Sequence, residues 1–322
     1  TRSAFVTGVQ TCALPIFILA ATLAVVVAEF LERRTRAFPA HGWLGLVALA
    51  GAQWLMFRGV EPVATYFTPI AWTAYLLVAD AALFALSGYS ALRHAPREFA
   101  RMALLSIPLW LIFEAYNLRL ANWTYTGLPQ NLFARWLGYA WSFATITPAL
   151  LLTAEVIAAL GWFSRPARAL RLAKRPRRER LMISLGAALL IVPVVLPRRI
   201  GAYLFVFVWL GFIFLLDPLL RRRGAPSLFA EFERGDYSRL GSLLVSGWIC
   251  GWLWEFWNFW AAAKWVYVFP IFQQLKIFEM PLPGYLGFPP FAIEAFLLYV
   301  FAARLLRSEE HTSELQSRTL IS

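Results

Sequence analysis

The chain alternates long apolar runs with short connections rich in charge, proline and glycine. Several runs reach the ~20 residues that an α-helix needs to cross a bilayer. Helices are expected because lipid offers the backbone no hydrogen-bond partner. The pattern predicts an all-α fold, a polytopic membrane helical bundle with about nine transmembrane helices. We expect them at residues 17–32, 43–58, 67–90, 98–121, 135–162, 181–197, 200–220, 239–262 and 284–305.

A pattern of polar and aromatic residues occurs twice inside this apolar sequence. Each copy has a Trp followed by an Asp, an aromatic–Glu pair three residues before an Asn, then a Trp-x-Tyr motif and a Pro. The first copy is Trp72, Asp80, Phe113, Glu114, Asn117, Trp123, Tyr125 and Pro129, and the second is Trp209, Asp217, Trp254, Glu255, Asn258, Trp265, Tyr267 and Pro270. An ionisable group at membrane depth costs roughly 2.5 kcal/mol or more, so its repetition points to function.

The repeated pattern also predicts how the chain is divided. Residues 67–163 and 200–306 are expected to form two three-helix repeats, and 164–199 a basic linker with a connecting helix. That extra helix gives both repeats the same orientation, so they are parallel repeats related by an axis along the membrane normal. Residues 17–66 form two peripheral helices, and residues 269–290 are expected to fold back as a cap. Residues 1–16 and 307–322 resemble a translated sequencing adapter, an artefact expected to add nothing to the core.

Composition supports a membrane protein and argues against a nucleic-acid partner. Hydrophobic residues make up 60% and charged residues 15%, against about 25% charged residues in soluble domains. The net charge is +12, but Lys and Arg gather in alternate connections. This positive-inside bias places the C-terminus in the cytoplasm of a bacterial-type inner (plasma) membrane. The basic run over 165–180 is expected to contact membrane lipid headgroups. The oligomeric state stays open.

The two Glu–Asn pairs are the leading candidates for chemistry. Glu114 and Asn117 share one helix face, as do Glu255 and Asn258, because residues three apart are neighbours on a helix. Both pairs lie about two turns from a helix end, so they converge if a two-fold axis passes between them. We expect the acids to exchange protons and the amides to orient them; Arg119 could pair with Glu114 and leave Glu255 as the proton donor. The alternative is that each pair bonds to a neighbouring helix and locks packing, for roughly 0.6 kcal/mol.

Other acids extend the list of candidates. Glu294 lies in the middle of the last predicted helix and is the third acid–base candidate. Asp80 and Asp217 lie near the ends of their helices, where a salt bridge and a functional role are both open. Glu155 has no repeat partner and is a weaker candidate.

Aromatic residues make up 16% of the chain. Many would form the interfacial belts, but a cluster around a carboxyl group would also stabilise a carbocation, by about 1–2 kcal/mol per desolvated ring. Plain packing remains open for each ring. The candidate substrate-binding residues are Trp254, Trp257, Trp123, Trp265, Tyr125 and Tyr267. No Gly-rich phosphate loop, Asp-rich diphosphate motif or His cluster occurs in the sequence, so we expect no cofactor and no metal site.

Two segments resemble a known family. Residues 106–125 contain Pro108, Glu114 and Trp123-x-Tyr125, and residues 287–297 contain Pro289, Pro290 and Glu294. Over about 67–305, these motifs and the three-plus-one-plus-three layout resemble the small membrane-type lycopene cyclase domain. That family's Pro-x-Glu-Glu motif is reduced here to one Glu, and its second-helix Asp is replaced by Glu.

The resemblance implies a cofactor-independent enzyme that acts on a long isoprenoid such as a carotenoid. A buried Glu would protonate a terminal double bond, and a second carboxylate would take a proton from the resulting cation. The rival hypothesis is a proton-coupled small-molecule transporter or a lipid-binding integral membrane protein. Carriers usually have helices broken at matching points of both halves, and Pro218 and the prolines of 281–290 have no such matched pair. A purely structural scaffold is a third possibility.

Overall fold

The computed structural model describes residues 2–165 and 176–319, with side chains described for 14–165 and 176–306. The described chain is helical apart from two short antiparallel strand pairs. The helices are α1 (Arg2–Arg33), α2 (Ala40–Phe57), α3 (Phe67–Ser87), α4 (Ala91–His94), α5 (Pro96–Leu120), α6 (Leu132–Ala159), α7 (Pro176–Val195), α8 (Arg198–Gly201), α9 (Phe205–Arg222), α10 (Leu228–Glu233), α11 (Ser238–Trp260) and α12 (Phe288–Thr319). The strands are β1 (Trp123–Thr126), β2 (Lys264–Tyr267), β3 (Lys276–Ile277) and β4 (Met280–Pro281), and the 3-10 segments are η1 (Ala202–Leu204) and η2 (Leu282–Gly287).

Among the described residues, seven helical segments are long and apolar enough to cross a membrane, which identifies an integral membrane protein. They are Leu14–Arg33, Ala40–Phe57, Phe67–Ser87, Pro96–Leu120, Leu132–Ala159, Arg198–Arg222 and Leu282–Leu306. Each of the nine predicted helices overlaps a helix of the structure, but α7 and α11 are not apolar enough to count among these seven segments. Charged residues open α7, and tryptophans together with Glu255 and Asn258 lower the mean hydropathy of α11.

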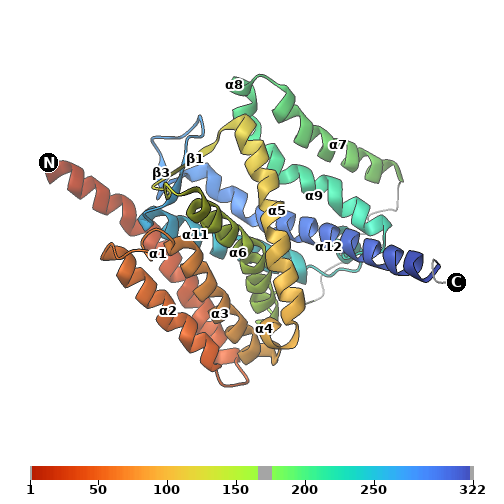
Figure 1. Cartoon of the computed structure of the whole chain (residues 1–322), viewed down its shortest axis with the longest axis horizontal. Helices are drawn as coiled ribbons and strands as arrows, with labels where there is room; N and C mark the ends of the chain where they lie inside the picture. The colour runs from red at the N-terminus through yellow and green to blue at the C-terminus, as the bar shows by residue number, and fades with distance from the viewer. Residues whose placement is uncertain (1, 166–175, 320–322) are drawn as a thin grey trace.

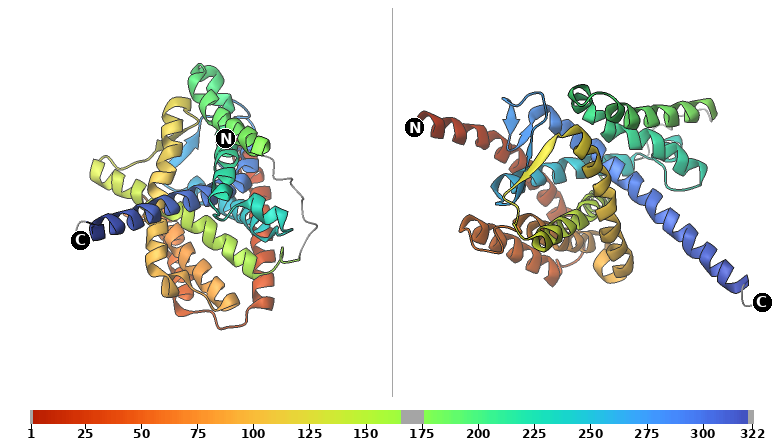
Figure 2. Two further views of the ribbon diagram at one scale, coloured as in Figure 1. Left: turned by 90° about the vertical axis from the view of Figure 1, so that its right-hand side faces the viewer. Right: turned by 45° about the horizontal axis from the view of Figure 1, so that its top comes forward.

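The long helices form a central group with a pair on either side (Figure 1). Helices α5, α6, α11 and α12 lie in the middle, where α6 packs against α5 and α11, and α12 packs against α11 and α5. The pair α2–α3 covers one flank and the pair α7–α9 the other, as the views in Figure 2 also show. Gly247 brings α11 close to α12, because a Cβ there would lie 2.3 Å from the carbonyl oxygen of Phe288.

A two-stranded ribbon joins the two parts of the chain at one end of the bundle. β1 follows α5, β2 follows α11, and the antiparallel register pairs Trp123 with Tyr267 and Tyr125 with Trp265. Side chains alternate between the two faces of a strand, so these four rings share one face of the ribbon. Gly127 ends β1 with a φ of +67°, and a Cβ at this position would meet the carbonyl oxygen of Ala262. Only glycine fits so close to that backbone.

The segment predicted as a cap folds into β3, β4 and η2 and packs through β4 on β2. Aromatic and apolar side chains of the segment pack against the bundle. Met280 and Tyr285 are buried, and the ring centroid of Tyr285 lies 4.4 Å from that of Trp252 on α11. The hydroxyl of Tyr285 donates to the carbonyl oxygen of Ile277. The segment therefore covers the same end of the bundle as the ribbon.

The outer turns of α1 and α12 project beyond the bundle (Figures 1 and 2). The side chains of residues 1–13 and 307–322 lie outside the described part of the structure. The expectation that both ends are adapter-derived and add nothing to the core therefore stays a prediction.

Candidate functional site

A cavity of about 150 Å³ lies beneath the ribbon, between the helices of the first part of the chain (α2–α6) and those of the second (α7–α12). Both parts contribute aromatic side chains to its wall. They are Tyr66, Trp72, Trp110, Phe113, Trp123, Tyr125, Tyr139 and Phe143 from the first part, and Trp209, Trp254, Trp265, Tyr267, Phe288 and Phe291 from the second. Five of the six predicted substrate-binding residues therefore line one cavity. The sixth, Trp257, packs behind the wall against Trp72, with ring centroids 4.9 Å apart.

Glu114 lies behind this wall, and one of its oxygens is held by three donors. The hydroxyl of Tyr125 donates to Oε1 at 2.5 Å, Nε1 of Trp110 at 2.9 Å and Nε1 of Trp123 at 3.3 Å. All three donor rings line the cavity, whereas Glu114 itself does not. The carboxyl group is therefore one hydrogen bond away from the cavity.

Glu255 has a corresponding but sparser set of contacts. The hydroxyl of Tyr267 donates to Oε1 at 3.0 Å, while Oε2 has no hydrogen-bond partner. Nε1 of Trp265 donates to the Tyr267 hydroxyl at 3.0 Å, so that oxygen both accepts and donates. Glu255 is fully buried and, like Glu114, does not line the cavity. The two acids therefore occupy corresponding positions with different numbers of donors.

The tyrosine hydroxyls remain neutral. Desolvation, together with the neighbouring Glu114, raises the pKa of Tyr125 well above its ordinary value. Desolvation and the neighbouring Glu255 raise the pKa of Tyr267 in the same way. Each ring therefore presents a hydroxyl group, not a phenolate, between its carboxyl group and the cavity.

The two asparagines do not bind the glutamates, which corrects the predicted orienting bond. The amide of Asn117 donates to the carbonyl oxygen of Trp123, and its oxygen accepts from the backbone N–H groups of Asn122 and Trp123. The amide of Asn258 makes the same two types of bond with the backbone of Trp265. Each asparagine thus fixes the corner where a helix becomes a strand, and it positions the glutamate only through the rings on that strand.

Arg119 does not pair with Glu114. Its Nη2 donates to the carbonyl oxygen of Leu196, in the connection before α8, at 2.7 Å. Residues five apart lie on different faces of a helix, whereas residues three or four apart are neighbours. The predicted ion pair is therefore wrong, and no arginine distinguishes Glu114 from Glu255; the number of hydrogen-bond donors does.

Glu294 is the most isolated acid of the described structure. It is fully buried on α12, and neither carboxyl oxygen has a hydrogen-bond partner. The backbone of Phe212 on α9 is a polar group beside it. Glu294 does not line the cavity, but Phe291, one turn earlier on α12, does. The structure therefore places Glu294 apart from the two tyrosine-bound acids.

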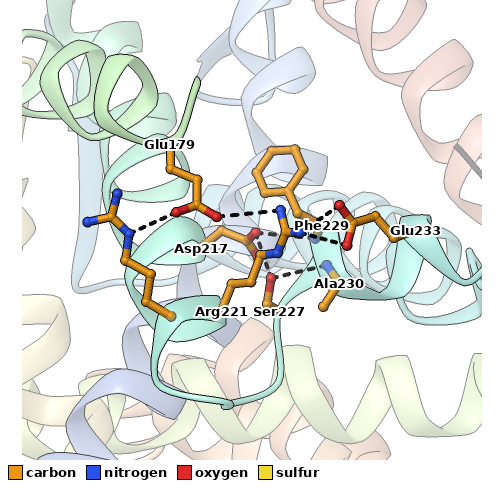
Figure 3. Close-up of polar contacts among 8 residues, drawn as sticks. Glu179, Asp217, Arg221, Ser227, Phe229, Ala230 and Glu233 are labelled. Carbon is orange, nitrogen blue, oxygen red and sulfur yellow. Dashed lines mark hydrogen bonds and ion pairs between the residues drawn. The ribbon is translucent and has the colours of Figure 1, made fainter. Parts of the chain in front are cut away.

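The aspartates and Glu155 have other positions. Asp217 accepts from the hydroxyl of Ser227 at 2.9 Å and from the backbone N–H of Leu228 at 2.7 Å, so it holds the start of α10 (Figure 3). Asp80 does the same for α4 through Ser90 at 2.6 Å. Arg221 pairs with Glu233 and Glu179 instead of Asp217. Both aspartates therefore tie a long helix to the start of the next short one, and Glu155 is exposed.

Several residues of the cavity wall were not predicted as site residues. Trp72 and Trp209 belong to the repeated pattern, which was the available signal, and both line the cavity. Trp110, Arg135 and Lys264 had no comparable signal in the sequence. Comparison of the chain with protein-family models, with curated proteins and with solved structures found no match, so the interpretation of the site rests on its geometry.

Proposed function

We propose that this protein is a cofactor-independent membrane enzyme that acts on a long isoprenoid by acid–base cyclisation or isomerisation, as a divergent relative of the lycopene cyclase domain. One observation carries the proposal: an aromatic cavity lies between the two parts of the chain, and each part supplies a tyrosine that links the cavity to a carboxyl group. Aromatic faces stabilise a carbocation, and a neutral hydroxyl bonded to a carboxyl group can pass a proton.

The reaction consists of two proton transfers. For this transfer the hydroxyl of Tyr267, which donates to Oε1 of Glu255 in the resting site, turns toward the substrate. Glu255 then gives its proton to the oxygen of Tyr267 while the hydroxyl proton of Tyr267 passes to a terminal alkene carbon, which leaves a carbocation on the substrate. The carbocation is attacked by a neighbouring double bond of the same chain. A proton next to the new cationic centre then passes through the hydroxyl of Tyr125 to Glu114, which has three donors to hold the carboxylate beforehand. No electrons are exchanged, so the substrate and product are isomers.

The size of the cavity limits which part of the substrate enters. A dry apolar cavity of about 150 Å³ accommodates a molecule of the size of benzene. The cavity beneath the ribbon therefore holds one end group of an isoprenoid. The remainder of the chain lies between helices or in the surrounding lipid.

The proposed architecture consists of nine transmembrane helices in two parallel repeats, each extended by one helix. A Cβ at Gly45 on α2 would lie 2.7 Å from the carbonyl oxygen of Ala74, and one at Gly186 on α7 would lie 2.7 Å from that of Gly211. Ala74 and Gly211 both lie two residues after the Trp of the repeated pattern. The repeat is thus α2–α3–α5–α6 and α7–α9–α11–α12. An even number of helices keeps both copies in one orientation, with the C-terminus cytoplasmic in a bacterial-type inner membrane.

The test is production of a new pigment or isoprenoid in a host that makes lycopene, with and without this chain. The wild-type protein is expected to convert the pigment, and Glu255→Gln to lower the yield by about 10²–10⁴-fold, because glutamine keeps the shape and loses the proton. Glu98→Gln is the matched control, since it makes the same change at an exposed position that is not a candidate site residue. No conversion by the wild-type protein would exclude this substrate class. Activity of Glu255→Gln would exclude Glu255 as the acid.

A further inference from the structure

One end of the cavity is unlike its aromatic middle. Arg135 and Lys264 both line the cavity, next to Pro129 and Ala263. Both are anchored near the end of β1, since Lys264 pairs with Thr126 across the ribbon and Nε of Arg135 donates to the carbonyl oxygen of Pro129 at 3.0 Å. An otherwise apolar cavity therefore has two cationic side chains at the end where β1 leads into α6.

The two cations differ in how far they are neutralised. Nζ of Lys264 lies 2.7 Å from a carboxyl oxygen of Glu279. Arg135 lies within 4.0 Å of no carboxylate among the described residues, and its bond to Pro129 uses one of five guanidinium N–H donors. Arg135 is thus a half-buried positive charge on the cavity wall that has no carboxylate partner.

Two further polar atoms in the wall lack partners. The hydroxyl of Thr68 and Nε1 of Trp72, one turn apart on α3, are buried, line the cavity and have no hydrogen-bond partner. The start of α3 lies beside the start of α6, because the hydroxyl of Tyr66 donates to the carbonyl oxygen of Ala134. A buried donor without a partner costs about 1–3 kcal/mol. A ligand with acceptor oxygens would remove that cost.

We propose that the cavity binds an amphiphile with a phosphate headgroup on Arg135 and an apolar tail among the aromatic rings. This inference rests on the same cavity as the proposed function and narrows the substrate to a phosphorylated isoprenoid. The planar guanidinium group matches the oxygens of a phosphate, which a hydrocarbon does not offer. Phosphate oxygens also accept from the hydroxyl of Thr68 and from the ammonium group of Lys264. A cavity of about 150 Å³ holds the headgroup end of one narrow tail, with the rest of the tail between helices or in lipid, which favours a single-chain isoprenoid phosphate over a two-chain phospholipid.

The experiment is a binding titration of the full-length protein in detergent micelles, followed by intrinsic tryptophan fluorescence. The probes are farnesyl diphosphate, farnesol, which has the same tail without the charge, and phosphatidylglycerol. The wild-type protein is expected to bind farnesyl diphosphate at least tenfold more tightly than farnesol. Arg135→Gln should abolish that difference and leave the affinity for farnesol unchanged, and Thr68→Val should reduce the difference.

The matched control is Arg198→Gln. Arg198 is exposed on α8 at the same end of the bundle and does not line the cavity, so its loss should leave the tenfold difference in place. Equal affinities of the wild-type protein for the two farnesyl probes, or equal effects of Arg135→Gln and Arg198→Gln, would overturn the inference. Displacement of farnesyl diphosphate by an equimolar amount of phosphatidylglycerol would assign the site to a bilayer lipid and exclude an isoprenoid phosphate as its ligand.

The binding result and the enzyme result are separable. Headgroup-dependent binding without any conversion in the lycopene-producing host supports this inference and removes lycopene as the substrate of the proposed reaction. Conversion of lycopene together with equal binding of both farnesyl probes supports the reaction and removes this inference.

Discussion

Removing the hydroxyl group of Tyr267 should cost much more stability than removing that of Tyr125. Tyr267→Phe leaves Oε1 of Glu255 without its donor and Nε1 of Trp265 without its acceptor. Because Oε2 of Glu255 already lacks a partner, the buried carboxyl group would have none. Two buried polar groups without partners cost roughly 2–6 kcal/mol together.

Tyr125→Phe is the same substitution at the corresponding position and should be mild. Oε1 of Glu114 keeps the donors from Trp110 and Trp123, so the variant loses one hydrogen bond out of three. One such bond is worth about 0.5–1.5 kcal/mol. The difference between the variants follows entirely from the number of donors that each glutamate retains.

The assay is equilibrium unfolding of the detergent-solubilised protein, with the free energy of unfolding measured for both variants. Tyr89→Phe is the control for loss of a phenol group, because Tyr89 is 42% exposed, and it should change stability by less than about 0.5 kcal/mol. If Tyr125→Phe destabilises as much as Tyr267→Phe, the two carboxyl groups are not supported as the structure indicates and the division of roles between them fails.

Two further predictions concern residues outside the cavity. Asn258→Ala leaves the backbone N–H and carbonyl groups of Trp265 without partners and should lower the free energy of unfolding by about 2–3 kcal/mol; an unchanged melting temperature would contradict its role at the helix–strand corner. Glu294→Met removes an acid without hydrogen-bond partners and fills its volume, so it should raise the melting temperature. A less stable Glu294→Met protein would show that the carboxyl group contributes to packing.

The helices could be predicted from the sequence, whereas the ribbon could not. Apolar runs of about 20 residues identify a membrane helix almost without context. β1 and β2 are four residues long, and their pairing joins segments more than 130 residues apart. A strand this short carries too little periodicity to be recognised. Because the tyrosines reach the glutamates from these strands, their place between acid and cavity could not be predicted either.

The roles of the polar residues were predictable only in part. The spacing of Glu255 and Asn258 placed them on one helix face, as α11 has them. Asn258 nevertheless lies in the last turn of α11, where the chain turns into a strand, and short amide side chains commonly bond to nearby backbone at such positions. The position of Trp257 was also predictable only in part. A cluster of tryptophans predicts aromatic surroundings, but Trp257 lies on the face of α11 that packs against Trp72 and does not line the cavity.

The differences between the two corresponding sites carry more information about function than their similarity. If the two glutamates served only helix packing, we would expect both to have the same number of hydrogen-bond donors. Here Glu114 has three donors and Glu255 has one. Two carboxyl groups in unlike surroundings can take opposite roles in one reaction, one giving a proton and one accepting it. In the proposed binding of a phosphate headgroup, Arg135 also determines which end of the ligand lies at the ribbon. Under the proposed function, this asymmetry allows the cavity to distinguish the two ends of an isoprenoid.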